Sequence, residues 1–265
     1  MLRSLYTAAT GMEAQETMMD VVANNLANAS TTGFKASQTN FADLISDTLQ
    51  APGGPQGGQT VSEPSGIQVG LGTRIQSTTP NLTQGTMSNT NNTFDLAIQG
   101  SGYFKVQQAD GTFAYTRAGN FSVSAQGQMV TQSGLMVEPG ISIPAQTTQV
   151  TISPQGLVSA TVAGQTNANQ IGQIELSTFT NPGGLLAQGN NLYSETSASG
   201  NAITVKPGEQ GTGQIAQGYL EGSNVQAVNE MVNMIAAQRA YEMNSQVITA
   251  ANDMLQRLTN IQLSS

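Results

Sequence analysis

Apolar residues recur with a helical period at both ends of the chain and with a period of two between them. The first helical stretch runs from Leu2 to about Ala29 and contains no Pro. Its apolar residues follow a heptad spacing, with Glu16 as the one break: Leu2, Leu5, Ala9, Met12, Met19, Ala23 and Leu26. This pattern predicts a helix that packs along one face and ends in the short polar residues before Gly33.

The C-terminal stretch, residues 223–265, has the same period and contains neither Gly nor Pro. Its seam alternates in steps of three and four, with Asn244 as the polar member: Met234, Ala237, Tyr241, Asn244, Ile248, Ala251, Leu255 and Leu258. Ser223 and Asn224 offer an N-cap, and Glu230 suits the positive end of the helix dipole. The pattern predicts one helix of about 35–40 residues, longer than the globular average of about 12.

The middle of the chain has short apolar alternations separated by turns that contain Gly or Asn. The expected strands are 94–98, 103–106, 112–115, 121–123, 129–130, 150–152, 157–158 and 171–179. Short strands with a Gly turn every few residues predict an all-β unit.

One segment, running from Pro52 to Gly72, fits neither pattern. It contains a run of Pro and Gly, and we single out Pro52, Gly53, Gly54, Pro55, Pro64 and Gly66. Such a composition is typical of an extended arm or of a flexible loop.

These patterns together predict an α+β fold. Residues 1–35 and 223–265 are expected to form a discontinuous helical domain, with the two long helices in a coiled coil. An extended connecting arm is expected over 36–75, and a β-rich outer domain over 76–222.

The composition excludes much catalytic chemistry. The chain has 265 residues, with no Cys and no His. Triads that contain His, Cys nucleophiles and thiolate or imidazole zinc sites are therefore excluded. We expect no enzyme, no metal and no cofactor, and a pair of carboxylates that meet in the fold is the remaining catalytic alternative.

The charge pattern argues against nucleic acid and favours self-association. Eight basic and 16 acidic residues give a net charge of −8, and charged residues are 9% of the chain. Such a surface is a poor ligand for phosphate backbones, and it repels other copies of itself weakly. No apolar run approaches the length of a membrane span or a secretory signal. We therefore expect no membrane insertion, and a protein that is cytoplasmic or exported without a cleaved signal.

The two terminal helices look marginal as an isolated hairpin. Their stripes hold few large apolar side chains for the number of residues that must be ordered. We expect the helices to pack against neighbouring copies, and an ordinary hairpin within one monomer is the alternative.

Several long motifs carry a family resemblance. They are 23–28 (Ala-Asn-Asn-Leu-Ala-Asn), 30–35 (Ser-Thr-Thr-Gly-Phe-Lys), 94–104, 218–225, 230–235 and 238–242. In this order they resemble the signatures of the bacterial flagellar rod, hook and hook-associated proteins. The motif residues that we single out are Asn24, Asn25, Asn28, Gly33, Phe34, Ser223, Asn224 and Arg239. Gly222 departs from the Ser or Thr that is common in the family.

Within the family, the chain length and residues 41–53 are most similar to the distal rod type. The resemblance implies a structural subunit that leaves the cell through the flagellar type III export apparatus and acts in the periplasmic part of the basal body. It would form a rigid helical tube around the export channel and transmit torque to the hook. Expected partners are further copies, proximal rod and hook proteins at the tube ends, and the surrounding P- and L-ring proteins.

The resemblance also assigns roles to the singled-out residues. The two heptad stripes would be self-assembly seams, and the Pro- and Gly-rich arm would stiffen the tube. Two alternatives stay open. One is a proximal rod or hook subunit of the same family, and the other is a monomeric β-rich surface binding module with a helical stalk.

Overall fold

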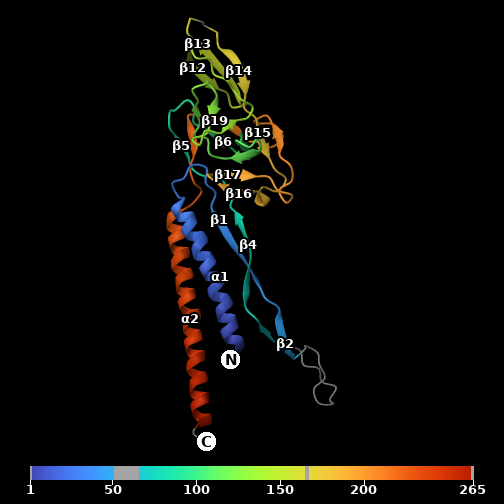
Figure 1. Cartoon of the computed structure of the whole chain (residues 1–265), viewed down its shortest axis with the longest axis vertical. Coiled ribbons are helices and arrows are strands. Elements are labelled where there is room, and N and C mark those ends of the chain that lie inside the picture. The colour runs from blue at the N-terminus through green and yellow to red at the C-terminus, as the bar shows by residue number, and fades with distance from the viewer. Residues whose placement is uncertain (1, 51–65, 165–166, 264–265) are drawn as a thin grey trace. The chain divides into compact units, whose positions relative to one another are not determined.

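The computed structural model describes residues 2–50, 66–164 and 167–263 of the chain. It has an N-terminal helix, a β-rich middle and a C-terminal helix, which confirms the predicted α+β class (Figure 1). By its internal contacts the chain divides into two compact units. Unit 1 comprises Met1–Leu26, Ser37–Thr79 and Gln226–Ser265, and unit 2 comprises Ala27–Ala36 and Pro80–Val225.

Unit 1 contains both long helices. α1 spans Leu2–Ala27 and α2 spans Ala227–Leu263, so α2 has the predicted length. The predicted N-cap is wrong, because α2 begins three residues after Asn224, whose side chain binds backbone groups of unit 2 instead. Neither helix, over its described residues, is apolar enough to cross a membrane.

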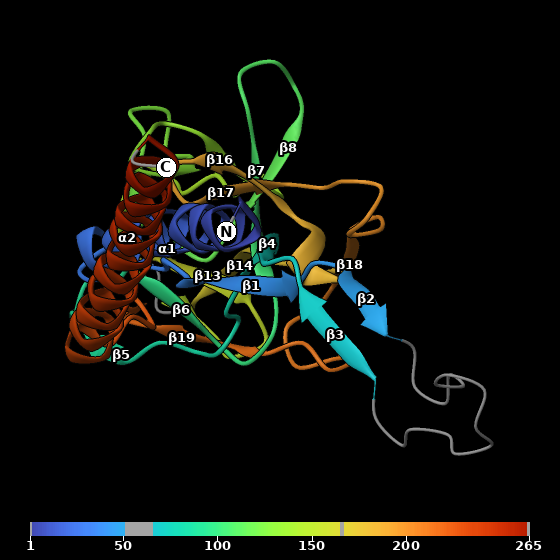
Figure 2. The ribbon, with the colours of Figure 1, turned by 90° about the horizontal axis from the view of Figure 1, so that it is seen from below.

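α1 lies between α2 and a β-ribbon (Figure 2). On one side, a Cβ added to Gly11 would come within 2.9 Å of the Asn244 amide nitrogen, so the two helices approach closely there. Near the other end of the contact, the Asn25 amide lies 3.5 Å from the Glu230 carboxylate. Gly11 and Asn25 are as far apart along α1 as Glu230 and Asn244 are along α2. Both contacts therefore report the same antiparallel register.

The ribbon of unit 1 is made of two strand pairs. β1 (Ser37–Asp43) pairs with β4 (Thr73–Pro80), and β2 (Ser46–Gln50) pairs antiparallel with β3 (Ile67–Gly70). Residues 67–70 therefore form a strand within the segment that lacked periodicity. The ribbon contacts α1 where the Thr10 hydroxyl accepts a hydrogen bond from the Thr73 amide, and where Arg3 forms an ion pair with Asp47.

Unit 2 is built from several antiparallel sheets. The largest has the order β16-β17-β8-β7-β11-β10-β9, and β15 pairs with both β7 and β18. Its strands are β7 (Tyr103–Gln107), β8 (Phe113–Thr116), β9 (Ser122–Val123), β10 (Met129–Val130), β11 (Met136–Val137), β15 (Leu176–Thr178), β16 (Leu186–Gly189), β17 (Leu192–Ser194) and β18 (Ile203–Val205). A short 3-10 helix, η1 (Pro182–Gly184), precedes β16.

Three smaller sheets complete unit 2. One has three strands, β12 (Thr147–Ile152), β13 (Leu157–Val162) and β14 (Asn169–Gln173). The other two are strand pairs: β6 (Leu96–Gln99) with β19 (Gln214–Gln217), and β5 (Met87–Asn89) with β20 (Tyr219–Glu221). These two pairs join residues before position 100 to residues after position 213, so they close the unit on itself.

The core of unit 2 forms where alternate strand residues point inward. Leu96, Ile98, Phe104 and Val106 are fully buried in its main apolar cluster. Tyr103, Tyr115 and Phe179 form a second cluster with edge-to-face ring contacts. The alternation therefore located the strands between residues 94 and 162 except β11, but 171–179 is not one strand. It divides into β14 and β15, and β5, β11 and the five strands from β16 to β20 were not predicted.

Candidate functional site

The predicted seam of α2 is the least exposed stripe of that helix. Ala237 and Ala251 are buried, and Met234, Asn244, Ile248 and Leu255 are half-buried. Tyr241 lies in the same stripe with its ring partly exposed. The side chain of Leu258 lies outside the described residues. Because Asn244 meets Gly11, this stripe is the face that α2 turns toward α1.

The predicted seam of α1 is not the face that is buried most deeply. Leu5, Met12, Met19 and Leu26 are half-buried, and Ala9 and Ala23 are exposed. The buried residues of α1 are Ala8, Ala14, Val22 and Asn25. Gly11 and Asn25, which contact α2, belong to a stripe next to the predicted one. The larger apolar residues of α1 thus remain accessible along part of the helix.

α2 also carries an apolar face opposite its seam. The residues there are exposed and large: Val228, Met231, Val232, Ile235, Met243, Val247 and Met254. Val228 is 74% exposed and Val232 59% exposed. At 100° per residue, Val228, Met231, Val232, Ile235 and Met243 fall on the side of the helix away from Ala237, whereas Val247 and Met254 lie on the flank of the seam, about 40° and 60° from Ala251. A helix that is apolar on two opposite faces is typical of a helix buried on both.

Asn25 fixes the end of α1 within unit 1. Its amide nitrogen donates to the Ser37 carbonyl at 2.8 Å, and its amide oxygen accepts from the Ser37 N–H at 2.9 Å. The side chain is almost fully buried, so these bonds satisfy groups that water does not reach. This bidentate contact ties the helix to the first residue of β1.

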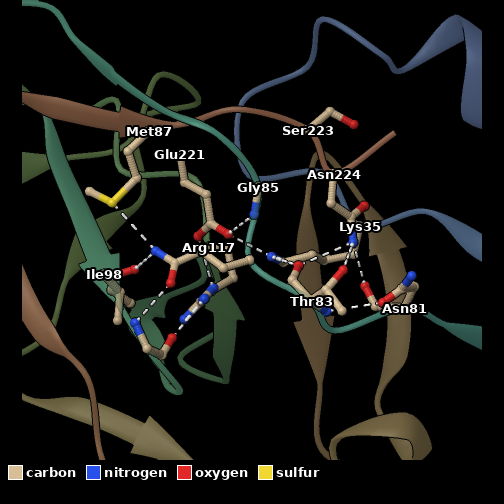
Figure 3. A network of polar contacts seen from close by, with 12 residues as sticks. Lys35, Asn81, Thr83, Gly85, Met87, Ile98, Arg117, Glu221, Ser223 and Asn224 are labelled. Carbon is tan, nitrogen blue, oxygen red and sulfur yellow. Dashed lines mark hydrogen bonds and ion pairs between the residues drawn. The ribbon is translucent and has the colours of Figure 1, made fainter. Parts of the chain in front are cut away.

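A buried polar cluster in unit 2 joins three distant parts of the sequence (Figure 3). The Lys35 ammonium donates to Glu221 Oε1 at 2.6 Å, and Arg117 Nε lies 3.1 Å from Glu221 Oε2. The Gly85 N–H also donates to Glu221, at 3.0 Å. The exposed fractions of the three charged side chains are 2%, 5% and 0% for Lys35, Arg117 and Glu221.

Further donors of the two cations bind backbone carbonyls. Lys35 donates to the Thr83 carbonyl at 2.9 Å, and Arg117 donates to those of Gly102 and Gly100 at 2.6 and 2.8 Å. Two cations share one carboxylate, so the cluster keeps one net positive charge away from water. Burial lowers the pKa of Lys35, and the hydrogen bond and charge of Glu221 oppose that shift. The arrangement is suited to holding segments together.

The motif residues before and after this cluster are tied into unit 2. Asn224 accepts from the Ala36 N–H at 2.7 Å and donates to the Asn81 carbonyl at 2.8 Å. Gly33 has a φ of +71°, and an added Cβ would lie 2.6 Å from the Ala118 amide nitrogen. Its own N–H donates to the Glu221 carbonyl at 2.8 Å. Only Gly fits there, because both the backbone conformation and the space exclude a side chain.

The other motif residues have more local surroundings. The Asn28 side chain accepts from the Thr31 hydroxyl, Ser223 accepts from the Val225 N–H, and Phe34 is half-buried. Asn24 and Arg239 are exposed on α1 and α2. Of the arm residues, Gly66 is half-buried before β3. Pro52, Gly53, Gly54, Pro55 and Pro64 lie outside the described residues.

Sequence reasoning missed the role of Lys35, Arg117 and Glu221. The available signal was that Lys35 and Glu221 stand inside motifs of a chain that is poor in charge. In the described part of the chain, no three acidic, His or Cys residues gather as metal ligands. A cavity of about 550 Å³ in unit 2 is lined by uncharged residues, among them Phe94, Val123 and Gln149. Neither feature presents a paired acid and base.

Three families match separate parts of the chain. The family described as flagella basal body rod protein matches residues 5–35. The flagellar hook protein FlgE/F/G D1 domain matches residues 97–160, and the flagellar basal body rod FlgEFG protein C-terminal family matches residues 216–261.

Similarity to curated relatives extends over almost the whole chain. The chain is 46% identical to the flagellar basal-body rod protein FlgG of Buchnera aphidicola subsp. Baizongia pistaciae, over 98% of this chain and 99% of the relative. It is also 46% identical to FlgG of Caulobacter vibrioides, with the same coverage. It is 45% identical to FlgG of Borreliella burgdorferi, again over 98% of this chain and 99% of the relative.

Proposed function

The chain belongs to the family of flagellar basal-body rod proteins, and from this membership we propose that it is a structural subunit of the distal rod. The predicted family is confirmed, and the relatives are named FlgG rather than hook protein. They are named for a rod and not for a reaction, which confirms the prediction of a protein that is not an enzyme. Its place of action is the rod of the flagellar basal body.

The observation that carries the proposal is the exposed apolar face of α2. Five large apolar side chains lie there and Val247 and Met254 lie on its flank, each roughly half exposed or more. Burying each of them would contribute on the order of 1 kcal/mol, about half of the value for full burial. One copy of the chain leaves this contribution unrealised, and a polymer of copies would gain it at every contact.

We extend the proposal to the division of labour between the units. Residues 1–35 and 223–265 would form the helical assembly domain, in which α1 and α2 act as a coiled coil. Residues 76–222 would form the outer β-rich layer of a tube. The seam residues of both helices would then pack within and between copies, and the tube would enclose the channel for exported chains.

The connecting segment 36–75 is our candidate for rigidity. In the described part of this segment, β2 and β3 form a ribbon in which Leu49 and Ile67 are exposed, and Ile45, just before β2, is exposed as well. A two-stranded ribbon with apolar residues in water is marginal by itself. A neighbouring copy would cover these residues, and the arm between the two strands would brace the tube. Deleting residues 52–64 is expected to give a bendable polymer; unchanged bending stiffness in electron micrographs would contradict this role.

The remaining partners follow from a place in the rod. We propose contacts with proximal rod and hook proteins at the tube ends, with the P- and L-ring proteins around the tube, and with the export apparatus during delivery. After export the chain would act in the periplasm.

Limited proteolysis of the purified chain, dilute and polymerised, tests assembly. In the dilute chain we expect cleavage in α1 and α2, and a core that begins near residue 27 and ends near residue 225. That core keeps Gly33 and Lys35, which are bound to Glu221. In the polymer both helices should resist the protease. Full resistance of the dilute chain together with failure to polymerise would instead favour a monomeric binding module.

A further inference from the structure

A second cavity of unit 2 reaches the buried cluster of Lys35, Arg117 and Glu221. Its volume is about 340 Å³, and both cations of the cluster line it. The lining also includes Leu82 and Ser101, which are exposed, so the rim of the cavity lies at the surface. Among the described residues that line it, none is acidic.

The two cations have more N–H groups than the chain supplies acceptors. An ammonium group has three N–H groups, and Lys35 uses two of them, on Glu221 and on a backbone carbonyl. Each terminal nitrogen of the Arg117 guanidinium has two N–H groups and uses one, on a backbone carbonyl. In the part of the chain that the structure describes, one N–H group of Lys35 and two of Arg117 therefore have no acceptor. Buried donors without a partner are costly and rare, so these call for an acceptor from outside the chain.

The charge of the cluster indicates an anion as that acceptor. Two cations share the single carboxylate of Glu221, so one positive charge has no counter-charge. A water molecule would accept the N–H groups but would leave this charge buried and unpaired, which is costly. One carboxylate matches the excess charge, whereas a phosphate group, at about −1.5 to −2 near pH 7, exceeds it.

The rest of the lining suits a short apolar body attached to the carboxylate. The buried rings of Tyr103 and Phe179 belong to it, and Leu82 and Pro182 add aliphatic surface. The two oxygens of a carboxylate accept several N–H groups at once and match the geometry of a guanidinium. The cavity therefore offers a cationic part for the carboxylate and an apolar part for a few carbon atoms.

We propose that this cavity binds a monocarboxylate with a short apolar body, held by the free N–H groups of Lys35 and Arg117. Two sources carry this chemistry: a free small acid, and an Asp or Glu side chain of a neighbouring copy. All lining residues belong to unit 2 of one chain, so the site itself does not depend on the proposed assembly.

A small acid and its uncharged analogue test the site. The probe is 3-methylbutanoate, and 3-methylbutanamide, which has nearly the same shape without the charge, is its control. Nuclear magnetic resonance of the dilute full chain, at constant ionic strength, follows the N–H signals of Ser101, Gly102 and Arg117 Nε. We expect the acid to shift these signals with a half-point of about 1–10 mM, which is reasonable for so small a ligand. The amide should bind at least about tenfold more weakly, because it leaves the excess charge unpaired.

Three results would overturn the proposal. They are no shift of these signals at about 100 mM acid, equal shifts with the amide, and equal shifts with chloride or sulfate. The last result would show a general response to anions without a preference for a carboxylate.

Leu82 provides a matched pair of variants that leaves the cluster itself unaltered. Leu82→Glu places a carboxylate at the rim of the cavity, and Leu82→Gln places an uncharged group of the same size there. Because a tethered group has a high local concentration, Leu82→Glu should weaken binding of the probe at least about tenfold. Leu82→Gln should change it by less than about threefold, as a neutral group does not compete for the excess charge. Equal binding by the two variants, both verified as folded by circular dichroism, would contradict the site.

The polymerised chain separates the two sources of the carboxylate. If the source is a free acid, carbon-13-labelled 3-methylbutanoate should bind the dilute chain and the polymer alike. If a side chain of a neighbouring copy fills the cavity, the probe should bind the dilute chain alone and raise the critical concentration for assembly. Absence of binding to the dilute chain overturns the site and leaves self-assembly standing, whereas failure to polymerise overturns self-assembly and leaves the site standing.

Discussion

Replacing the buried carboxylate Glu221 by its neutral isostere is the sharpest test of what holds unit 2 together. The Glu221→Gln side chain keeps the size of the original but removes the only negative charge of the cluster. Lys35 and Arg117 would then remain buried without a counter-charge. One carboxylate oxygen would also be replaced by an amide NH2 group, a donor that faces either the Lys35 ammonium or the Arg117 guanidinium.

The expected cost follows from the burial of all three groups. Removing one partner of a buried ion pair typically costs about 3–5 kcal/mol, because the remaining charge is left uncompensated. Glu221 is fully buried and serves two cations, so we expect the upper half of that range. With a urea m-value of about 2 kcal/mol per molar, the unfolding midpoint should fall by about 2 M.

The assay is urea unfolding of the full chain, followed by the near-ultraviolet signal of Tyr103 and Tyr115 in unit 2. Glu209→Gln, at an exposed position of the same unit, is the matched control and should change stability by less than about 0.5 kcal/mol. In the double variant with Lys35→Gln, the loss should be smaller than the sum of the two single losses, since the charges are coupled. A cost below about 1 kcal/mol for Glu221→Gln would refute the view that the cluster holds unit 2 together.

Three further changes test other parts of the structure. Gly33→Ala should cost at least about 1–3 kcal/mol in urea unfolding, since the residue has a positive φ and its Cβ would press on the Ala118 backbone. Burial raises the pKa of Tyr103 to about 12. The folded state therefore loses stability as the pH rises from about 10 to 12, by about 2–3 kcal/mol, and Tyr103→Phe should reduce that loss in unfolding at pH 9 and 11.5. Gly11→Ala should leave helix melting almost unchanged, because the gain of about 1 kcal/mol in helix propensity offsets the displacement of the flexible Asn244 amide; Gly11→Leu should lower it by about 1–3 kcal/mol, and equal effects of both changes would contradict close packing at this position.

Local sequence patterns predicted the two helices but did not predict the buried cluster of Lys35, Arg117 and Glu221. The helices and most core strands follow from periodicity, because burial of one face imposes a repeat on the sequence. The Lys35, Arg117 and Glu221 cluster joins segments that are more than 80 residues apart, and no local rule connects them. Charged residues are also rarely buried, so the ordinary expectation places these three at the surface.

The helix end at Asn224 illustrates a second limit. Ser and Asn before a helical stretch normally indicate an N-cap, since their side chains bind free N–H groups. Here the Asn224 amide binds the Ala36 N–H and the Asn81 carbonyl, which are distant in sequence. Tertiary bonds of this kind compete with the cap, and the helix begins later as a result.

Helix α1 shows why the heptad pattern alone could not identify the face that contacts α2. Periodicity selects the stripe with the larger residues, which contains Leu5, Met12 and Met19. The contact with α2 instead uses Gly11 and Asn25, because a small residue lets the helices approach and an amide can bind the neighbouring backbone. A close contact inside the chain therefore leaves the larger apolar residues only half-buried. Large apolar residues that recur at heptad spacing but are not fully buried within one chain indicate burial by a second copy. The heptad pattern of α1 therefore reports on assembly more directly than on the fold of the monomer.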